Sequence, residues 1–142
     1  MSIADTIKFD DAFIASWNSK DANDTLVLLA DGAVWHDVGA PEPMRDREAI
    51  RRYVQTWSTA FPDMRAVTKN RVVTEDQVAV EVEFSGTNTG PLQMGPVALP
   101  PTGKKVNGKG TYFVRVQNGK AIEVHTYPDI AGMMMQLGMM PS

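Results

Sequence analysis

The sequence predicts an α+β fold, with helices in the first half of the chain packed on one face of a curved sheet formed by the second half. Apolar residues recur at helical spacing up to Pro62, and after it the period falls from 3.6 to 2. The second half also contains two alternating runs joined by Asn118 and Gly119, a strong hairpin signal. Segregated helices and meandering strands are typical of this class. With 142 residues and 43% apolar content, a single domain over residues 1–142 is expected.

Two helices are predicted at the amino-terminal end. Residues 5–19 have aromatic side chains at i, i+4 and i+8, the spacing of one helical face. Residues 21–30 continue the apolar pattern and end at Asp31-Gly32, because glycine favours the conformation that follows a helix. The aromatic residues of the first helix are Phe9, Phe13 and Trp17.

A short strand, residues 33–38, and a third helix, residues 46–60, are expected next. The strand is rich in β-forming residues and is ended by glycine and prolines in residues 39–43. Asp46 is the expected N-cap of the helix, and Pro62 stops its continuation. The apolar stripe of this helix consists of Ile50, Tyr53, Val54, Trp57 and Phe61.

Four antiparallel strands are predicted after Pro62. Residues 64–74 and 77–89 alternate on either side of a turn, and residues 90–104, with four of the nine prolines, form a loop. The last two strands form the hairpin around Asn118-Gly119. A short apolar helix, residues 130–137, then follows.

The register of the final hairpin stays open between two alternatives. A three-residue loop would pair Arg115 with Glu123 and Phe113 with His125, and would place all four on one face. A two-residue loop would pair Arg115 with Ile122 instead. A shift of one residue moves side chains to the other face, so the register decides which residues share a pocket.

Composition excludes several classes of partner. The formal charge of −3 and pI near 5.3 leave no basic surface for nucleic acid or an anionic membrane. There is no cysteine, which excludes thiolate chemistry and disulfides. No apolar run approaches the roughly 20 residues needed to cross a bilayer, and the first ten residues lack a signal-peptide pattern. A cytoplasmic protein is expected.

Neither a metal nor a cofactor is expected. The two histidines, His36 and His125, have no HxH or HExxH spacing. A zinc site would therefore need carboxylates brought from remote strands.

Six short strings, taken in order, resemble the SnoaL-like polyketide or ester cyclase family of the nuclear transport factor 2-like superfamily. The resemblance spans residues 33–138. It implies a cone-shaped, cystatin-like α+β barrel with a deep pocket, and relatives usually form homodimers through the sheet. The strings are AVWHDVGAPEP, AFPDM, GTNTG, PPTGKKV, R-x-x-NGK-x-I-E, and D-x-x-G followed by QLG.

The resemblance also implies a catalytic residue. In this family an aspartate after the last strand acts as acid and base in an intramolecular aldol ring closure, without cofactor or metal, and it corresponds to Asp129. The family's histidine on the preceding strand has Arg115 as its nearest counterpart. Where many relatives have GTHTG, this chain has Asn88 in place of the histidine.

Three residues are accordingly the catalytic candidates. Asp129 is the expected acid and base, although its position before an apolar helix equally suits an N-cap. Arg115 would stabilise negative charge, or would only form an exposed pair with Glu123. His36 would be a second proton carrier if its strand points it inward.

The expected ligand is a small hydrophobic, aromatic or polyketide-like molecule held by pocket-lining side chains. The candidate substrate-binding residues are Phe13, Trp17, Trp35, Asp37, Trp57, Phe84, Asn88, Phe113, His125 and Tyr127.

Rival functions remain open. The string HDVGAPEP also resembles the ketosteroid isomerases around their catalytic base, which would give that role to Asp37, but the tyrosine of that family falls at Phe13. Epoxide hydrolysis by two aspartates and an arginine is a further alternative. A non-catalytic binding or dimerisation module is the third, since one fold hosts many functions.

Overall fold

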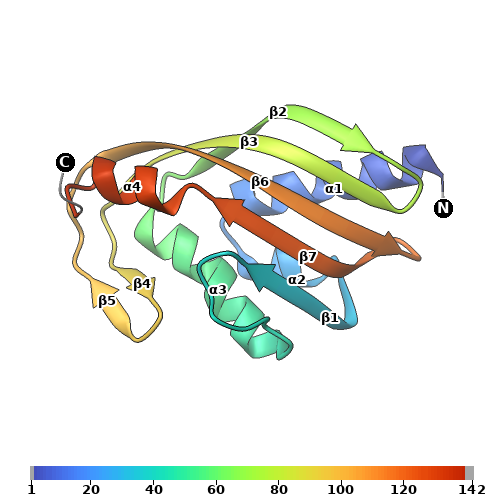
Figure 1. Cartoon of the computed structure of the whole chain (residues 1–142), viewed down its shortest axis with the longest axis horizontal. Helices are drawn as coiled ribbons and strands as arrows, with labels where there is room; N and C mark the ends of the chain where they lie inside the picture. The colour runs from blue at the N-terminus through green and yellow to red at the C-terminus, as the bar shows by residue number, and fades with distance from the viewer. Residues whose placement is uncertain (1, 140–142) are drawn as a thin grey trace.

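The protein is an α+β domain, as predicted, in a computed structural model that describes residues 2–139 (Figure 1). The elements are α1 (Ile3–Ser19), α2 (Ala22–Leu26), β1 (Leu29–Asp37), α3 (Arg47–Ala60), β2 (Arg65–Val73), β3 (Gln77–Thr87), β4 (Leu92–Met94), β5 (Val97–Leu99), β6 (Lys105–Gln117), β7 (Lys120–Pro128) and α4 (Ile130–Gln136).

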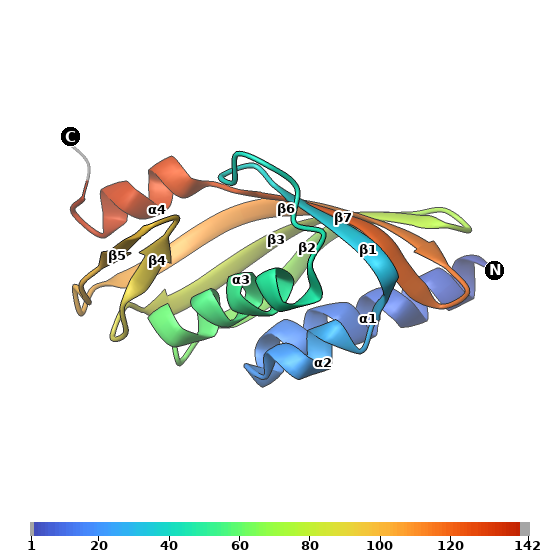
Figure 2. The same ribbon diagram turned by 90° about the horizontal axis from the view of Figure 1, so that it is seen from below.

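A curved five-stranded sheet forms one layer and the helices α1, α2 and α3 form the other (Figure 2). The strand order is β1-β7-β6-β3-β2, antiparallel throughout except for the parallel pair β1 and β7. Residues that alternate along these strands face either the helices or the outer side of the sheet. Within residues 2–139, no helix has the length and apolar character required to cross a membrane.

The first strand is longer than predicted. Helix α2 ends at Leu26, and β1 already begins at Leu29, whose backbone pairs with Ala121 of β7. Pairing with a strand more than 90 residues away overrides the local helical pattern of residues 27–30. The proline-rich segment also contains the small hairpin β4–β5, which lies beside α3 in Figure 2.

The β6–β7 hairpin combines the two registers considered from the sequence. Its turn has two residues, Asn118 and Gly119, both in the left-handed region with φ of 53° and 77°. A β-bulge then shifts the pairing between Arg115 and Val116, so that Arg115 lies opposite Glu123 and Phe113 opposite His125. The extra residue, Ile122, allows the two-residue turn to give the pairing expected of a three-residue loop.

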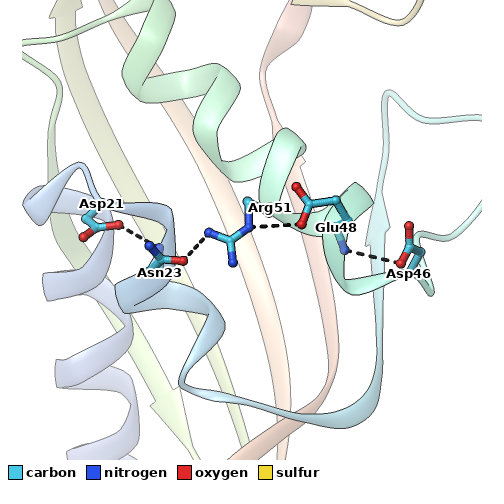
Figure 3. A network of polar contacts seen from close by, with 5 residues as sticks. All are labelled: Asp21, Asn23, Asp46, Glu48 and Arg51. Carbon is cyan, nitrogen blue, oxygen red and sulfur yellow. Dashed lines mark hydrogen bonds and ion pairs between the residues drawn. The ribbon is translucent and has the colours of Figure 1, made fainter.

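The caps of α2 and α3 are joined by one arginine (Figure 3). Asp21 and Asp46 cap the two helices, as predicted for Asp46. Arg51 of α3 donates to the side chains of Asn23 in α2 and of Glu48, the latter at 3.2 Å. These exposed contacts link the amino-terminal ends of α2 and α3 at the surface.

The side chain of Asn88 forms hydrogen bonds that hold the proline-rich segment after β3 in place. Its side chain is fully buried; its amide donates to the backbone carbonyls of Ala60 (3.2 Å) and Gly90 (2.9 Å), and its oxygen accepts from the amide and hydroxyl of Thr102, both at 2.9 Å. Asn88 therefore joins the end of α3 to both ends of the segment that carries β4 and β5. This is a structural role, in place of the substrate-binding role predicted from the sequence.

Asn88→Ala is expected to lower the free energy of unfolding by about 2–3 kcal/mol, because it leaves several buried backbone groups without partners. Asn107→Ala is the matched control, since Asn107 is exposed and bonds the Gln136 side chain through its backbone amide and carbonyl. Urea denaturation of both variants measures the difference. Equal stability of the two would show that Asn88 does not hold the segment.

Candidate functional site

An apolar cavity of about 100 Å³ lies between α1, α3 and the inner face of the sheet. Three aromatic side chains from three elements form much of its wall: Trp17 of α1, Trp57 of α3 and Phe84 of β3. Trp57 packs against Phe84, and Trp17 packs edge-on against Trp35, so the rings of the wall support one another. The cavity is lined by Ile14, Trp17, Tyr53, Trp57, Met64, Ala66, Val82, Phe84, Lys109, Gly110, Thr111, Tyr112, Thr126 and Pro128.

Five polar groups meet at one end of this cavity. The Asp37 carboxylate oxygen Oδ1 accepts from the Tyr53 hydroxyl at 2.7 Å and from the Thr126 hydroxyl at 2.6 Å. The indole Nε1 of Trp35 donates to Thr126 Oγ1 at 3.1 Å, and the other oxygen of Asp37 accepts from the Gly39 amide at 2.9 Å. A carboxylate has about four acceptor positions, so about one is left for a ligand.

Tyr53 is held in its protonated form. Burial raises the pKa of the Tyr53 phenol well above its ordinary value of about 10, and the negative charge of Asp37 raises it further. At neutral pH Tyr53 is therefore a hydrogen-bond donor beside an acceptor. A donor and a carboxylate in contact at an apolar wall form a pair suited to proton transfer.

A wider groove adjoins the same cluster. It has a volume of about 1090 Å³ and lies between α3, the β4–β5 hairpin and the loop after β1, and Asp37 and Ile130 are on its rim. Tyr53 and Trp57 line both the groove and the inner cavity. A multi-ring molecule is too large for the cavity alone, but the groove could hold its body while one polar end reaches Asp37 and Tyr53.

A second buried polar cluster lies further along the sheet. Asp10 of α1 is fully buried and accepts from the Tyr112 hydroxyl, and its other oxygen is 3.0 Å from Arg71 of β2. Burial raises the pKa of Tyr112, and so does the charge of Asp10. Since its polar groups satisfy one another, this cluster ties α1 to the sheet.

Asp129 occupies the N-cap of α4. Its carboxylate accepts from the Gly132 amide at 2.9 Å, and its side chain is exposed. It borders a shallow polar depression on the outer side of the sheet, together with Lys69, Glu81 and Lys109. Of the two roles considered from the sequence, this position matches the cap.

Arg115 also lies on the outer side of the sheet. Its side chain is 46% exposed, and its guanidinium is 3.9 Å from the Asp76 carboxylate in the β2–β3 turn. Arg115 pairs with Glu123, and Asp129 comes six residues later along the chain, which separates them by roughly 20 Å along β7. The structure therefore does not bring the predicted catalytic pair together.

The inward orientation expected of His36 is wrong. Alternation along β1 places Trp35 inside, where it is fully buried, so His36 faces outward. There it stacks on His125, with ring centroids 4.3 Å apart. His125 in turn is 2.5 Å from Glu123, and this hydrogen bond holds the pKa of the Glu123 carboxyl below its ordinary value.

The predicted substrate-binding residues divide into three groups. Trp17, Trp57 and Phe84 line the inner cavity, and Asp37 lies on the rim of the groove. Phe13 and Trp35 are fully buried behind them. The rest are elsewhere: Phe113, His125 and Tyr127 on the outer face, and Asn88 under the proline-rich segment.

Tyr53 and Thr126 are site residues that the sequence analysis did not single out. Tyr53 belongs to the apolar stripe of α3, and Thr126 lies within an ordinary alternating strand. A tyrosine on a helical stripe carries a hydroxyl that needs a partner when it is buried. The need of a buried hydroxyl for a partner could therefore have indicated a polar group near Tyr53, and in the structure that group is Asp37.

Comparison with known proteins identifies the family. The sequence profile of the SnoaL-like polyketide cyclases matches residues 7–137. The chain belongs to the SnoaL-like polyketide cyclase family. No curated protein matches its sequence significantly.

Solved structures of similar shape include proteins from several bacteria. IdmH of Streptomyces antibioticus, described as a candidate polyketide cyclase, is 29% identical, with a TM-score of 0.74, over 92% of this chain and 96% of its own. AclR of Streptomyces galilaeus, a candidate hydroxylase, is 21% identical, with a TM-score of 0.83, over 99% of this chain and 89% of its own. An epoxide hydrolase of M. tuberculosis is 16% identical, with a TM-score of 0.68, over 95% of this chain and 90% of its own. Likeness at these last two identities establishes the fold alone.

Folding stability is expected to fall as pH rises above about 10. The unfolded chain releases the phenol protons of Tyr53 and Tyr112 near pH 10, whereas the folded chain retains them because both pKa values are raised. Stability is therefore fully present below pH 10 and declines above it. Urea denaturation between pH 8 and 11 measures the slope, which is expected to be smaller in Tyr53→Phe. An unchanged slope in that variant would contradict the burial of Tyr53.

Proposed function

We propose that the protein is a cofactor-independent enzyme that removes a proton from carbon next to a carbonyl in a small, hydrophobic, polyketide-type molecule. Asp37 is the base, and the Tyr53 hydroxyl, whose single proton is directed at Asp37 in this structure, turns that proton to the carbonyl oxygen of the bound substrate. The observation that supports this most is the Asp37–Tyr53–Thr126 contact at the junction of an apolar cavity and a larger groove. Family membership agrees with a small-molecule substrate.

The reaction is a proton transfer in two stages. The Asp37 carboxylate takes the proton from the carbon, and the electron pair of the broken C–H bond forms a carbon–carbon double bond. The π pair of the carbonyl moves onto its oxygen, where the Tyr53 hydroxyl stabilises the negative charge. In an aldol ring closure, the enolate carbon then attacks a second carbonyl carbon of the same molecule. The resulting alkoxide recovers the proton from Asp37, so no oxidant, metal or further reactant is consumed.

Each neighbour of the pair has a supporting task. Thr126 holds the Asp37 carboxylate in place and is itself oriented by the Trp35 indole. The Gly39 amide fixes the second carboxylate oxygen. Thr126 and the Gly39 amide already hold the carboxylate in place, so only the Tyr53 hydroxyl has to redirect its proton when the substrate binds. Trp57 and the β4–β5 hairpin would bind the rings of the substrate.

Proton abstraction is shared by the two enzyme classes that the sequence suggests. Aldol cyclisation and ketosteroid-type isomerisation both begin with an enolate and differ in what the enolate does next. Isomerisation returns the proton to a different carbon of the same molecule. The volume of the groove and the apolar wall favour a multi-ring substrate in either case.

The test measures enolisation with 2-tetralone, a bicyclic aromatic ketone, by following deuterium uptake at its α-carbons in D₂O by NMR. Asp37→Asn is expected to lower the rate by about 100-fold or more, the usual contribution of a general base. Tyr53→Phe is expected to lower it by about 10- to 100-fold through loss of the donor.

Asp129→Asn is the matched control, because asparagine caps a helix about as well as aspartate and should leave the rate unchanged. Loss of exchange in Asp129→Asn with full activity in Asp37→Asn would transfer the role to Asp129, as the family resemblance first suggested. Binding of the ketone, seen as a change in tryptophan fluorescence, without any catalysed exchange would favour a binding module.

A further inference from the structure

Two histidines and a glutamate form a cluster on the outer face of the sheet, away from the proposed active site. Strands β1 and β7 run parallel in a register that places His36 directly beside His125. Their imidazole rings are stacked, with centroids 4.3 Å apart and planes within 3°. Neither ring contacts the inner cavity or the groove.

Glu123 completes the cluster. It lies two residues before His125 on the same strand, so both side chains are on one face, and its carboxylate is 2.5 Å from His125 Nε2. One donor atom from each of the three residues lies within 4.8 Å of the others. All three side chains are partly buried, which limits their freedom before any ligand arrives.

The donor set and its spacing suit a transition-metal ion. Two imidazole nitrogens and one carboxylate oxygen are a combination that binds Zn²⁺ with three protein ligands and leaves a fourth position for water. Donors around tetrahedral zinc are roughly 3.3 Å apart, given bond lengths of about 2 Å. The two stacked rings must therefore rotate until their lone pairs converge on the ion, and the Glu123–His125 hydrogen bond is replaced by two bonds to the metal. Strand backbones, unlike loops, hold the three Cα positions fixed.

We propose that His36, Glu123 and His125 bind a divalent first-row transition-metal ion of the zinc type. The ion joins β1, the edge strand of the sheet, to β7 across almost 90 residues of chain. A link that closes so long a loop stabilises the fold by restricting the unfolded chain. The next pair in the register is Asp37 beside Thr126, so the link lies directly behind the proposed catalytic base.

The test uses the full chain without an affinity tag and ZnCl₂ as the probe, with calorimetry for affinity and sedimentation for oligomeric state. One Zn²⁺ per chain and a raised melting temperature are expected. Replacement by Co²⁺ should give the intense visible absorption of a tetrahedral ion. His36→Gln and His125→Gln should each weaken Zn²⁺ binding by about tenfold or more, and the double variant should abolish it.

Glu83→Gln is the matched control, because Glu83 is an exposed carboxylate on the same face of the sheet that neighbours Lys69 and no histidine. It should bind Zn²⁺ as the parent does. Unchanged affinity in the double histidine variant would overturn the proposal. So would a stoichiometry of one ion per two chains, which would show that a second copy supplies part of the site. Circular dichroism of each variant establishes that it is folded.

Discussion

The parallel pairing of β1 with β7 determines which side chains enter the interior of this protein. Its register places Trp35 beside Val124, His36 beside His125 and Asp37 beside Thr126. Trp35 and Val124 join the core, the histidines stack outside, and Asp37 and Thr126 share a hydrogen bond at the end of the strands. A slip of one residue would exchange the two faces, so both the proposed catalytic cluster and the proposed metal site depend on this pair.

The same pairing helps to explain how a charged carboxylate is stabilised beside an apolar cavity. Burial of a charge is costly unless hydrogen bonds satisfy it. Asp37 obtains donors from β7, from α3 and from its own loop, through Thr126, Tyr53 and Gly39. Elements far apart in sequence therefore converge on one carboxylate.

Local patterns predicted the fold well, and non-local pairing limited what they predicted of the site. The helical stripe of α3, its cap at Asp46 and the Asn118-Gly119 turn depend on neighbours in sequence, and the structure confirms them. The orientation of His36 depends on the partner of β1, which no local pattern reveals. The bulge at Ile122 is similarly defined only by the complete pairing of β6 with β7. Tyr53 can be recognised as a site residue only once α3 is known to lie over Asp37.

A crystal structure with 2-naphthol, a planar mimic of the enol of 2-tetralone, would locate the base of the enolisation. We predict that the naphthol oxygen lies within about 3.2 Å of the Tyr53 hydroxyl or the Asp37 carboxylate, with its rings against Trp57. Binding of the naphthol beside Asp129, on the outer side of the sheet, would contradict the assignment of Asp37 as the base.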